Sequence, residues 1–156
     1  LVENLKRTKL SAKVVIRDFH QFESKNLFDI VLVDAPCSST GTIRRNCDLQ
    51  YLNPDKRVDN LAKYQKSIVK KAMLFVKPGG RLLYCTCSLV SSEGEGVIEE
   101  ILQQSKNWKQ EVISGKNLGI NSAWIDSAGG LRLRPDFWQP IGGMDGFYIA
   151  ILLRQN

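Results

Sequence analysis

The stretch that decides the fold is Phe28-Asp29-Ile30-Val31-Leu32-Val33-Asp34-Ala35-Pro36-Cys37-Ser38. Its apolar part, residues 28–33, is typical of a strand that is covered on both faces in a parallel sheet. Asp34 follows directly, and Pro36 stiffens the turn because its ring fixes the backbone and it has no N–H to donate. The stretch therefore predicts a buried strand that ends abruptly in a polar turn.

A second apolar run has the same organisation. Arg81-Leu82-Leu83-Tyr84-Cys85 is followed by Thr86-Cys87-Ser88, so another predicted strand ends in a polar turn that carries a cysteine. In an open α/β sheet, ligands bind in the crevice outside the carboxyl ends of the strands. If the two strands are parallel neighbours, Asp34, Cys37 and Cys87 lie at one edge of the sheet. A carboxyl group and two thiols in one cleft indicate covalent chemistry rather than binding alone.

The residues between these two strands predict one long helix. Asn53-Pro54-Asp55 gives its start, because Asn can cap, Pro suits the first position and Asp faces the positive end of the helix dipole. From Val58 to Val76 apolar residues recur with a period near that of a helix, and Gln65 is a gap in the stripe. Lys77-Pro78-Gly79-Gly80 then ends the helix. The order of elements predicts a β-α-β unit.

Shorter elements are predicted along the rest of the chain. Residues 2–9 indicate the end of a basic helix, and residues 12–17 predict a short strand that Asp18 closes. Ser92 to Glu95 forms a capping box that opens another helix. Further strands are expected at residues 108–113, 131–134 and 146–153, with an antiparallel hairpin between the last two at one sheet edge. Together these elements predict a single α/β domain over residues 1–156.

Composition limits the class of protein. The chain has 156 residues, of which 43% are hydrophobic, and this suits one core. No apolar stretch is long enough for a membrane span, and no signal peptide opens the sequence, so we expect a cytoplasmic protein without membrane contact. Lys and Arg outnumber Asp and Glu by 22 − 16 = 6. A basic balance fits a polyanionic partner such as nucleic acid, and a solubilising surface excess is the alternative.

The cysteine and histidine content argues against a metal centre. Four cysteines and one histidine are present, and Cys85 and Cys87 are separated by one residue instead of two. This spacing does not suit zinc, and we expect no metal. Free thiols in a cytosolic setting are catalytic or buried instead. Cys85 shares a strand face with Cys87, and we interpret Cys85 as a core residue.

Several short blocks share their residues and spacing with one known family. The blocks are Asp34 to Gly41, Ile43-Arg44-Arg45, Pro78-Gly79-Gly80, Tyr84 to Leu89, Arg134-Pro135 and Gly143 to Tyr148. With them the chain resembles the Sun (RsmB-type) family of RNA cytosine-5 methyltransferases. The two cysteines in their contexts are the specific part of this resemblance. It implies a Rossmann-like fold of the S-adenosylmethionine-dependent methyltransferase type, mostly parallel, with an antiparallel C-terminal hairpin.

The resemblance also implies catalytic roles for three residues. Cys87 is expected to be the nucleophile that adds to carbon 6 of cytosine, which activates carbon 5 toward a methyl donor. Cys37 is expected to assist loss of the carbon-5 proton and release of the enzyme. Asp34 is expected to hydrogen-bond the base. The target cytosine must be single-stranded or flipped out of its stack to be reached.

Binding residues follow from the same resemblance. The methyl donor is expected to be S-adenosyl-L-methionine, with Asp18 near its adenine and with Asp34 and Pro36 near its methionine part. Arg44 and Arg45 are expected to bind RNA phosphates, with a solvated surface as the alternative. We expect small-subunit rRNA as the substrate, with transfer RNA as the alternative.

The sequence also departs from the family pattern. Cys47-Asp48 stands where the family usually has Pro-Asp, and the Gly-rich loop that holds the donor's methionine is absent. We therefore expect a fold that is truncated on its N-terminal side and a fragment that binds donor weakly. Two other functions remain open. One is a DNA methyltransferase, in which the Pro-Cys cysteine is the nucleophile, and the other is a non-catalytic RNA-binding remnant of the fold.

Overall fold

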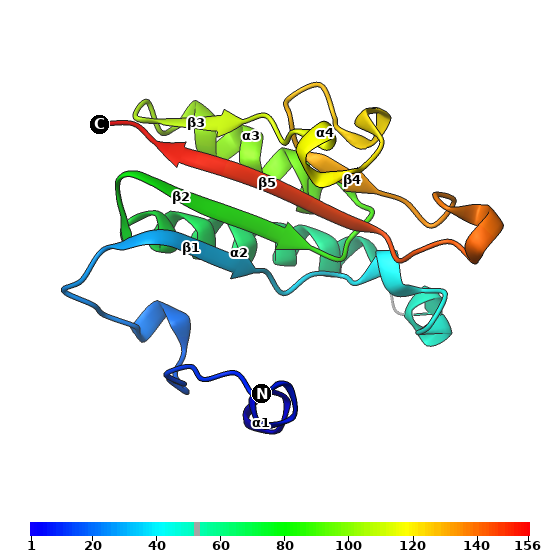
Figure 1. The fold of residues 1–156 in the computed structure, drawn as a ribbon, viewed down its shortest axis with the longest axis horizontal. Helices are drawn as coiled ribbons and strands as arrows, with labels where there is room; N and C mark the ends of the chain where they lie inside the picture. The colour runs from blue at the N-terminus through cyan, green and yellow to red at the C-terminus, as the bar shows by residue number, and fades with distance from the viewer. Residues whose placement is uncertain (52–53) are drawn as a thin grey trace.

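The computed structural model describes residues 1–51 and 54–156, which fold around one five-stranded sheet (Figure 1). The strands are β1 (Phe28–Asp34), β2 (Val76–Thr86), β3 (Trp108–Glu111), β4 (Leu131–Leu133) and β5 (Phe147–Arg154). The helices are α1 (Val2–Thr8), α2 (Pro54–Met73), α3 (Glu95–Gln103) and the single turn α4 (Gly115–Leu118). Short 3₁₀ turns, labelled η1 to η6, lie between them.

The two strands that end in cysteine turns are neighbours. β1 pairs with β2 in parallel, and the register places Val33 beside Tyr84 and Asp34 beside Cys85. α2 connects the two strands, so the predicted β-α-β unit is confirmed. Because both strands run the same way, the segments that follow them begin at the same edge of the sheet.

β5 gives the sheet its mixed character. The strand order is β1-β2-β5-β3, and β5 pairs antiparallel with β2, β3 and β4. β1, β2, β3 and β4 therefore share one direction, and β5 alone opposes them. The structure confirms the α/β class, and β4 and β5 pair antiparallel as predicted. However, β5 lies inside the sheet between β2 and β3 and not at its edge.

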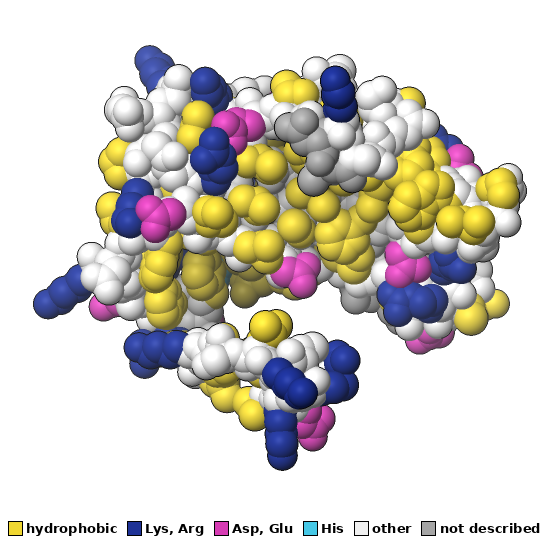
Figure 2. Space-filling view, in the orientation of Figure 1, with side chains coloured by type: hydrophobic (Ala, Val, Ile, Leu, Met, Phe, Trp, Pro, Cys, Tyr) yellow, Lys and Arg dark blue, Asp and Glu magenta, His cyan; other side chains and the backbone are white. Residues whose placement is uncertain are grey.

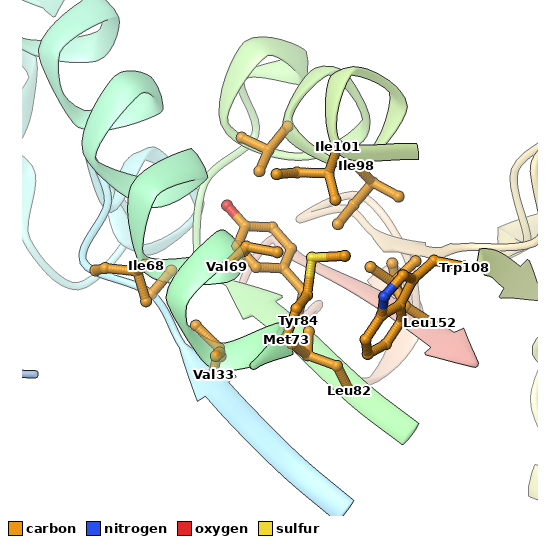
Figure 3. Close-up of a cluster of buried hydrophobic side chains, with 14 of the residues drawn as sticks. Val33, Ile68, Val69, Met73, Leu82, Tyr84, Ile98, Ile101, Trp108 and Leu152 are labelled. Atoms are coloured by element: carbon orange, nitrogen blue, oxygen red, sulfur yellow. The ribbon is translucent and has the colours of Figure 1, made fainter. Parts of the chain in front are cut away.

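The main core lies between one face of the sheet and the helices α2 and α3. Buried apolar side chains from both helices meet buried residues of the strands in one cluster (Figure 3). The largest members include Tyr84, Leu82, Ile98, Ile101 and Leu152, each almost fully buried. In α3 the buried residues are Val97, Ile98 and Ile101. Apolar burial of this kind is the main source of fold stability.

The opposite face of the sheet is covered only in part, because a second buried cluster around Trp124 and Leu131 packs against β5 and leaves β1 open. Figure 2 shows hydrophobic side chains gathered over this face. On β1, Ile30 is 63% exposed and Leu32 is 62% exposed, whereas Val33 is buried. The prediction that both faces of this strand are covered is therefore wrong for the described residues, because no helix among them packs on that side.

Residues 12–17 do not form the predicted strand. They are irregular, and Ile16 is 94% exposed. A strand needs a neighbour that satisfies its backbone N–H and C=O groups, and no described strand pairs with this segment. The helix predicted at residues 2–9 is present as α1, with no buried residue.

Two predicted helix boundaries are also wrong. α2 ends at Met73, and residues 77–80 belong to the start of β2, where the pairing with β1 is irregular between Phe28 and Ile30. The predicted capping box is not formed, because Gly94 is the N-cap of α3 without a side-chain cap. The predicted cap at Asn53 lies outside the described residues. Among the helices that the structure describes, none has the length and apolarity needed to span a membrane.

Candidate active site

Two cysteine thiols meet at the carboxyl edge of β1 and β2. Cys37 Sγ lies 3.4 Å from Cys87 Sγ, although the two residues are 50 positions apart. Cys37 lies three residues beyond the end of β1, and Cys87 lies directly after β2. The parallel pairing of the strands brings these turns together, so the structure places the cysteines as the sequence predicted. Their chemical roles remain predictions.

The two thiols differ in exposure. Cys37 is buried, and burial raises the pKa of its thiol to about 11, with the nearby Cys87 as a smaller cause. Cys37 is therefore a neutral thiol at pH 7. Cys87 is half-buried, and its Sγ lies 3.6 Å from Ser39 Oγ. Of the pair, Cys87 is the more accessible to a substrate.

The other two cysteines lie apart from this pair. Cys85 is buried, and burial raises the pKa of its thiol to about 11, with the charge of Asp34 as a further cause. It is inert as a nucleophile at neutral pH, in agreement with the interpretation of Cys85 as core. Cys47 is exposed in η3 (Cys47–Tyr51). Among the residues that the structure describes, no cluster of His, Cys, Asp and Glu could hold a metal ion.

A buried carboxyl group connects the two cysteine turns. Glu93 is fully buried and accepts hydrogen bonds from Ser38 N at 2.9 Å, from Ser38 Oγ, and from Ser88 Oγ at 2.7 Å. Ser38 follows Cys37 and Ser88 follows Cys87. Gln65 of α2 donates from Nε2 to the same carboxyl group at 3.0 Å and to Pro36 O at 2.8 Å. One side chain therefore contacts both turns and the helix behind them.

The backbone of the first turn passes very close to its neighbours. Gly41 N donates to Cys87 O at 2.8 Å, and Gly41 O accepts from Gly146 N at 2.8 Å. A Cβ atom at Gly41 would lie 2.2 Å from Gly146 O and 2.7 Å from Cys87 O. Only glycine fits there, and its close approach connects the cysteine turns to the start of β5.

The predicted RNA-binding arginines contact the segment before β5. Arg44 Nη2 donates to Gly142 O at 3.0 Å, and Arg45 forms an ion pair with Asp145 at 2.5 Å. The Arg45 side chain is nevertheless 64% exposed. Arg45 thus contacts the closing Gly143 to Gly146 block and Arg44 contacts the residue before it, and both side chains remain exposed.

Comparison with known proteins agrees with this arrangement. A family model described as 16S rRNA methyltransferase RsmB/F matches residues 1–153. The chain belongs to this family. A protein of Sodalis glossinidius named ribosomal RNA small subunit methyltransferase B is 43% identical over 157 residues, covering 99% of this chain and 33% of that protein. Its namesake of Shewanella oneidensis is 33% identical over 155 residues, covering 97% of this chain and 34% of that protein.

Solved structures show the same fold. The structure of NSun6 from Pyrococcus horikoshii with SFG, an analogue of S-adenosylmethionine, matches with a TM-score of 0.77 at 27% identity, covering 99% of this chain and 38% of that one. A methyltransferase homologue of the same organism matches with a TM-score of 0.68 at 27% identity, covering 98% of this chain and 48% of that one. The fold is therefore of the Rossmann-like methyltransferase type. The RsmB/F chain described here spans about a third of the length of the curated relatives.

The three residues predicted to hold the methyl donor, Asp18, Asp34 and Pro36, are exposed. Asp34 and Pro36 are exposed at the end of β1, beside Cys37. Asp18 is exposed at the start of η1 (Phe19–Gln21), where its Oδ1 accepts from His20 N at 2.8 Å. Two open carboxylates suit the amino groups of S-adenosyl-L-methionine, so the residues present fit this group. No described hydrogen bond connects Asp18 with the turn that carries Asp34 and Pro36.

Sequence reasoning missed three polar residues of this RsmB/F site. Glu93 lies inside the predicted capping box, and Gln65 is the gap in the predicted apolar stripe. Arg132 lies in a predicted strand, and it donates to Ser88 O at 2.6 Å and to both carboxyl oxygens of Glu95. The polar gap at Gln65 was a usable signal, because a polar residue on a core-facing stripe needs a partner.

Proposed function

We propose that this chain is the catalytic part of an enzyme that methylates carbon 5 of a cytosine in RNA, with small-subunit rRNA as its substrate. The observation that carries the proposal is the 3.4 Å separation of Cys37 and Cys87 at the end of β1 and β2. Membership of the RsmB/F family supports it. The proposal includes a single catalytic domain over residues 1–156 and a cytoplasmic location.

In this proposal Cys87 is the nucleophile. Its thiolate forms a bond from Sγ to carbon 6 of cytosine, and the electron pair of the 5,6 double bond makes carbon 5 nucleophilic. S-adenosyl-L-methionine supplies the methyl group to carbon 5 when it is bound. Such covalent catalysis divides one difficult step into two easier ones. The partial exposure of Cys87, in contrast to the buried Cys37, supports this assignment.

Cys37 serves the release step. After methylation, a base removes the proton from carbon 5, the 5,6 double bond forms again, and the bond from Cys87 Sγ to carbon 6 breaks. Cys37 Sγ is in contact with Cys87 Sγ, so it lies beside the atom that is bonded to the cytosine. Cys37 first passes its own proton to solvent water, and the resulting thiolate then takes the proton from carbon 5.

Asp34 orients the cytosine. Its carboxylate is exposed at the end of β1, three residues before Cys37, where it can accept a hydrogen bond from the exocyclic amino group of the base. The exposed guanidinium of Arg45 supports the proposed contact with RNA phosphates.

Methylation of RNA by the full-length protein tests this function. Purified protein is incubated with labelled S-adenosyl-L-methionine and with 16S rRNA, transfer RNA or DNA, and the products are digested to nucleosides. We expect labelled 5-methylcytidine from 16S rRNA only. Label in transfer RNA or DNA instead would reassign the substrate, and binding of RNA without any label would identify a non-catalytic module.

A further inference from the structure

The most tightly enclosed charged group in the described chain is not one of the predicted catalytic residues. Glu93 has no solvent exposure, and its two carboxyl oxygens accept from four donors. Oε1 receives Ser38 N and Gln65 Nε2, and Oε2 receives the hydroxyls of Ser38 and Ser88. Four donors match the acceptor capacity of an ionised carboxyl group. Burying a carboxylate with fewer hydrogen-bond donors would cost folding free energy, so all four donors are needed to stabilise Glu93 in this position.

The partners of Glu93 lie directly beside the two thiols. Ser38 and Ser88 each follow one of the paired cysteines in sequence, and their hydroxyls are also 3.2 Å apart. Thr40 extends the contact, because its Oγ1 lies 3.2 Å from Ser88 Oγ and accepts from Leu89 N at 2.9 Å. The carboxyl group thus bridges the turn after β1 and the turn after β2 on the side away from solvent.

Other contacts also hold the two turns and their sulfur atoms, since the backbone of Ser39 and of Cys87 bonds to Cys37 Sγ and Ser39 Oγ lies 3.6 Å from Cys87 Sγ. Ala35 N donates to Cys85 O at 2.9 Å before the cysteines, and Gly41 N donates to Cys87 O four residues after Cys37. Between these two points, the described hydrogen bonds that fix the Pro36-Cys37-Ser38 backbone are those to Glu93 and Gln65. Gln65 is itself fully buried and touches Glu93, so α2 supports the same bridge.

We infer that Glu93 is a positioning residue that sets the separation and orientation of the Cys37 and Cys87 thiols by clamping Ser38 and Ser88 together. It touches neither thiol and takes no part in bond formation. The inference deepens the proposed function, since a misplaced Cys37 would slow release from Cys87. The geometric part stands without that function, because it concerns only the two sulfur atoms.

Thiol–disulfide exchange measures that geometry directly. The full-length protein is equilibrated with mixtures of reduced and oxidised glutathione, and linked Cys37–Cys87 peptides are counted by mass spectrometry. Each bond formed reduces one oxidised glutathione to two thiols. In Glu93→Gln the side chain keeps its shape but presents an amide that cannot accept from all four donors. The equilibrium gives the effective concentration of the Cys37 thiol toward the Cys87 thiol. We expect this effective concentration to fall about tenfold or more in Glu93→Gln, since it depends on how the two thiols are oriented.

A matched control separates positioning from general loosening. Tyr84→Phe removes the hydrogen bond of 2.7 Å from Tyr84 Oη to Glu93 O but leaves the carboxyl group and its donors intact. We expect a comparable loss of thermal stability with an unchanged effective concentration. If Glu93→Gln fails to fold, Ser88→Ala removes one donor to the clamp, and we expect a smaller fall in the same direction. Equal effects of Glu93→Gln and Tyr84→Phe, or no effect of either clamp variant, would overturn the inference.

The same variants separate this inference from the proposed function. With RNA and donor, Glu93→Gln is expected to lower kcat about a hundredfold, as misplacement of a reacting group does, while KM for both substrates is unchanged. A rise in KM with kcat retained would contradict the clamp. If the wild-type protein methylates nothing, the proposed function fails, but the disulfide comparison still decides the role of Glu93.

Discussion

Cys37 Sγ and Cys87 Sγ lie 3.4 Å apart, and each follows one of two parallel neighbouring strands. This contact results from topology, because a β-α-β unit returns the chain to the same sheet edge. The buried member has a raised thiol pKa and the half-buried member faces the site. Environment alone thus distinguishes two chemically identical side chains, and this difference is the basis of their proposed division of roles.

Replacement of Gly41 by alanine tests the close approach beside Cys87. The added Cβ would overlap Gly146 O and Cys87 O, both of which are backbone atoms that cannot rotate away. We expect Gly41→Ala to lower the free energy of unfolding by about 3 kcal/mol, as overpacking does. Chemical denaturation measures this change. Gly96→Ala, in the first turn of α3, is the control and should change stability by less than about 1 kcal/mol.

Loss of Arg132 tests the support beneath the second cysteine turn. Arg132 is 16% exposed, pairs with Glu95, donates to Ser88 O and covers the ring of Tyr148 at 4.6 Å. We expect Arg132→Ala to cost about 2 kcal/mol, below the value for a fully buried pair because Glu95 is partly exposed. In Arg134→Ala, which breaks an exposed pair with Asp136, the loss should stay below about 1 kcal/mol. Similar losses in both variants would contradict this account.

Alkaline pH should destabilise the fold through its buried thiols. Burial raises the pKa of Cys85 and Cys37 to about 11 in the folded chain, above the ordinary thiol value of about 8.5. A raised folded pKa means that stability is full below the unfolded pKa and falls as pH rises toward the folded one. We therefore expect the melting temperature to fall between about pH 8.5 and pH 11.

Two cysteine variants identify the source of that alkaline fall. Cys85→Ala removes one buried thiol and should flatten the dependence of melting temperature on pH, whereas Cys47→Ala removes an exposed thiol and should leave the slope unchanged. Tyr84 and Tyr148 add to the fall in every variant, because burial raises their pKa as well. An unchanged slope in Cys85→Ala would show that its thiol is not buried in solution.

The salt dependence of RNA binding tests the two predicted arginines. Arg45 is largely exposed, and we expect Arg45→Ala to reduce the slope of log affinity against log salt by about one unit. Arg44→Ala should act more through its lost contact to Gly142 O. Lys109→Ala on β3, also exposed, is the control and should leave the slope unchanged. Equal slopes for Arg45→Ala and wild type would remove Arg45 from the RNA contact.

The sequence was most informative where a pattern and a chemical requirement coincided. Two apolar runs ending in cysteine turns predicted the β1–β2 edge, since strand ends in such sheets carry function. Residues 12–17 have the same apolar character but form no strand, because strand formation also requires a pairing partner that composition cannot show. The position of β5 between β2 and β3 was likewise invisible, because sheet order depends on contacts between distant segments.

Glu93 shows what a linear sequence hides at the site itself. It lies between Ser92 and Glu95, the two residues of the predicted capping box, and nothing in the neighbouring sequence distinguishes it from a surface carboxylate. Its function as a hydrogen-bond acceptor arises only when Ser38, Ser88 and Gln65 converge from three separate elements. Buried polar clusters of this kind are specified by the folded state as a whole.

Trapping of the covalent RNA adduct tests the central claim most directly. The full-length protein, as Cys37→Ala and as Cys87→Ala, is incubated with 16S rRNA and S-adenosyl-L-methionine and resolved on a denaturing gel. The account predicts a slower-migrating protein–RNA band that accumulates in Cys37→Ala, where release is blocked, and no such band in Cys87→Ala. A band in Cys87→Ala and none in Cys37→Ala would contradict it, because Cys37 would then be the nucleophile.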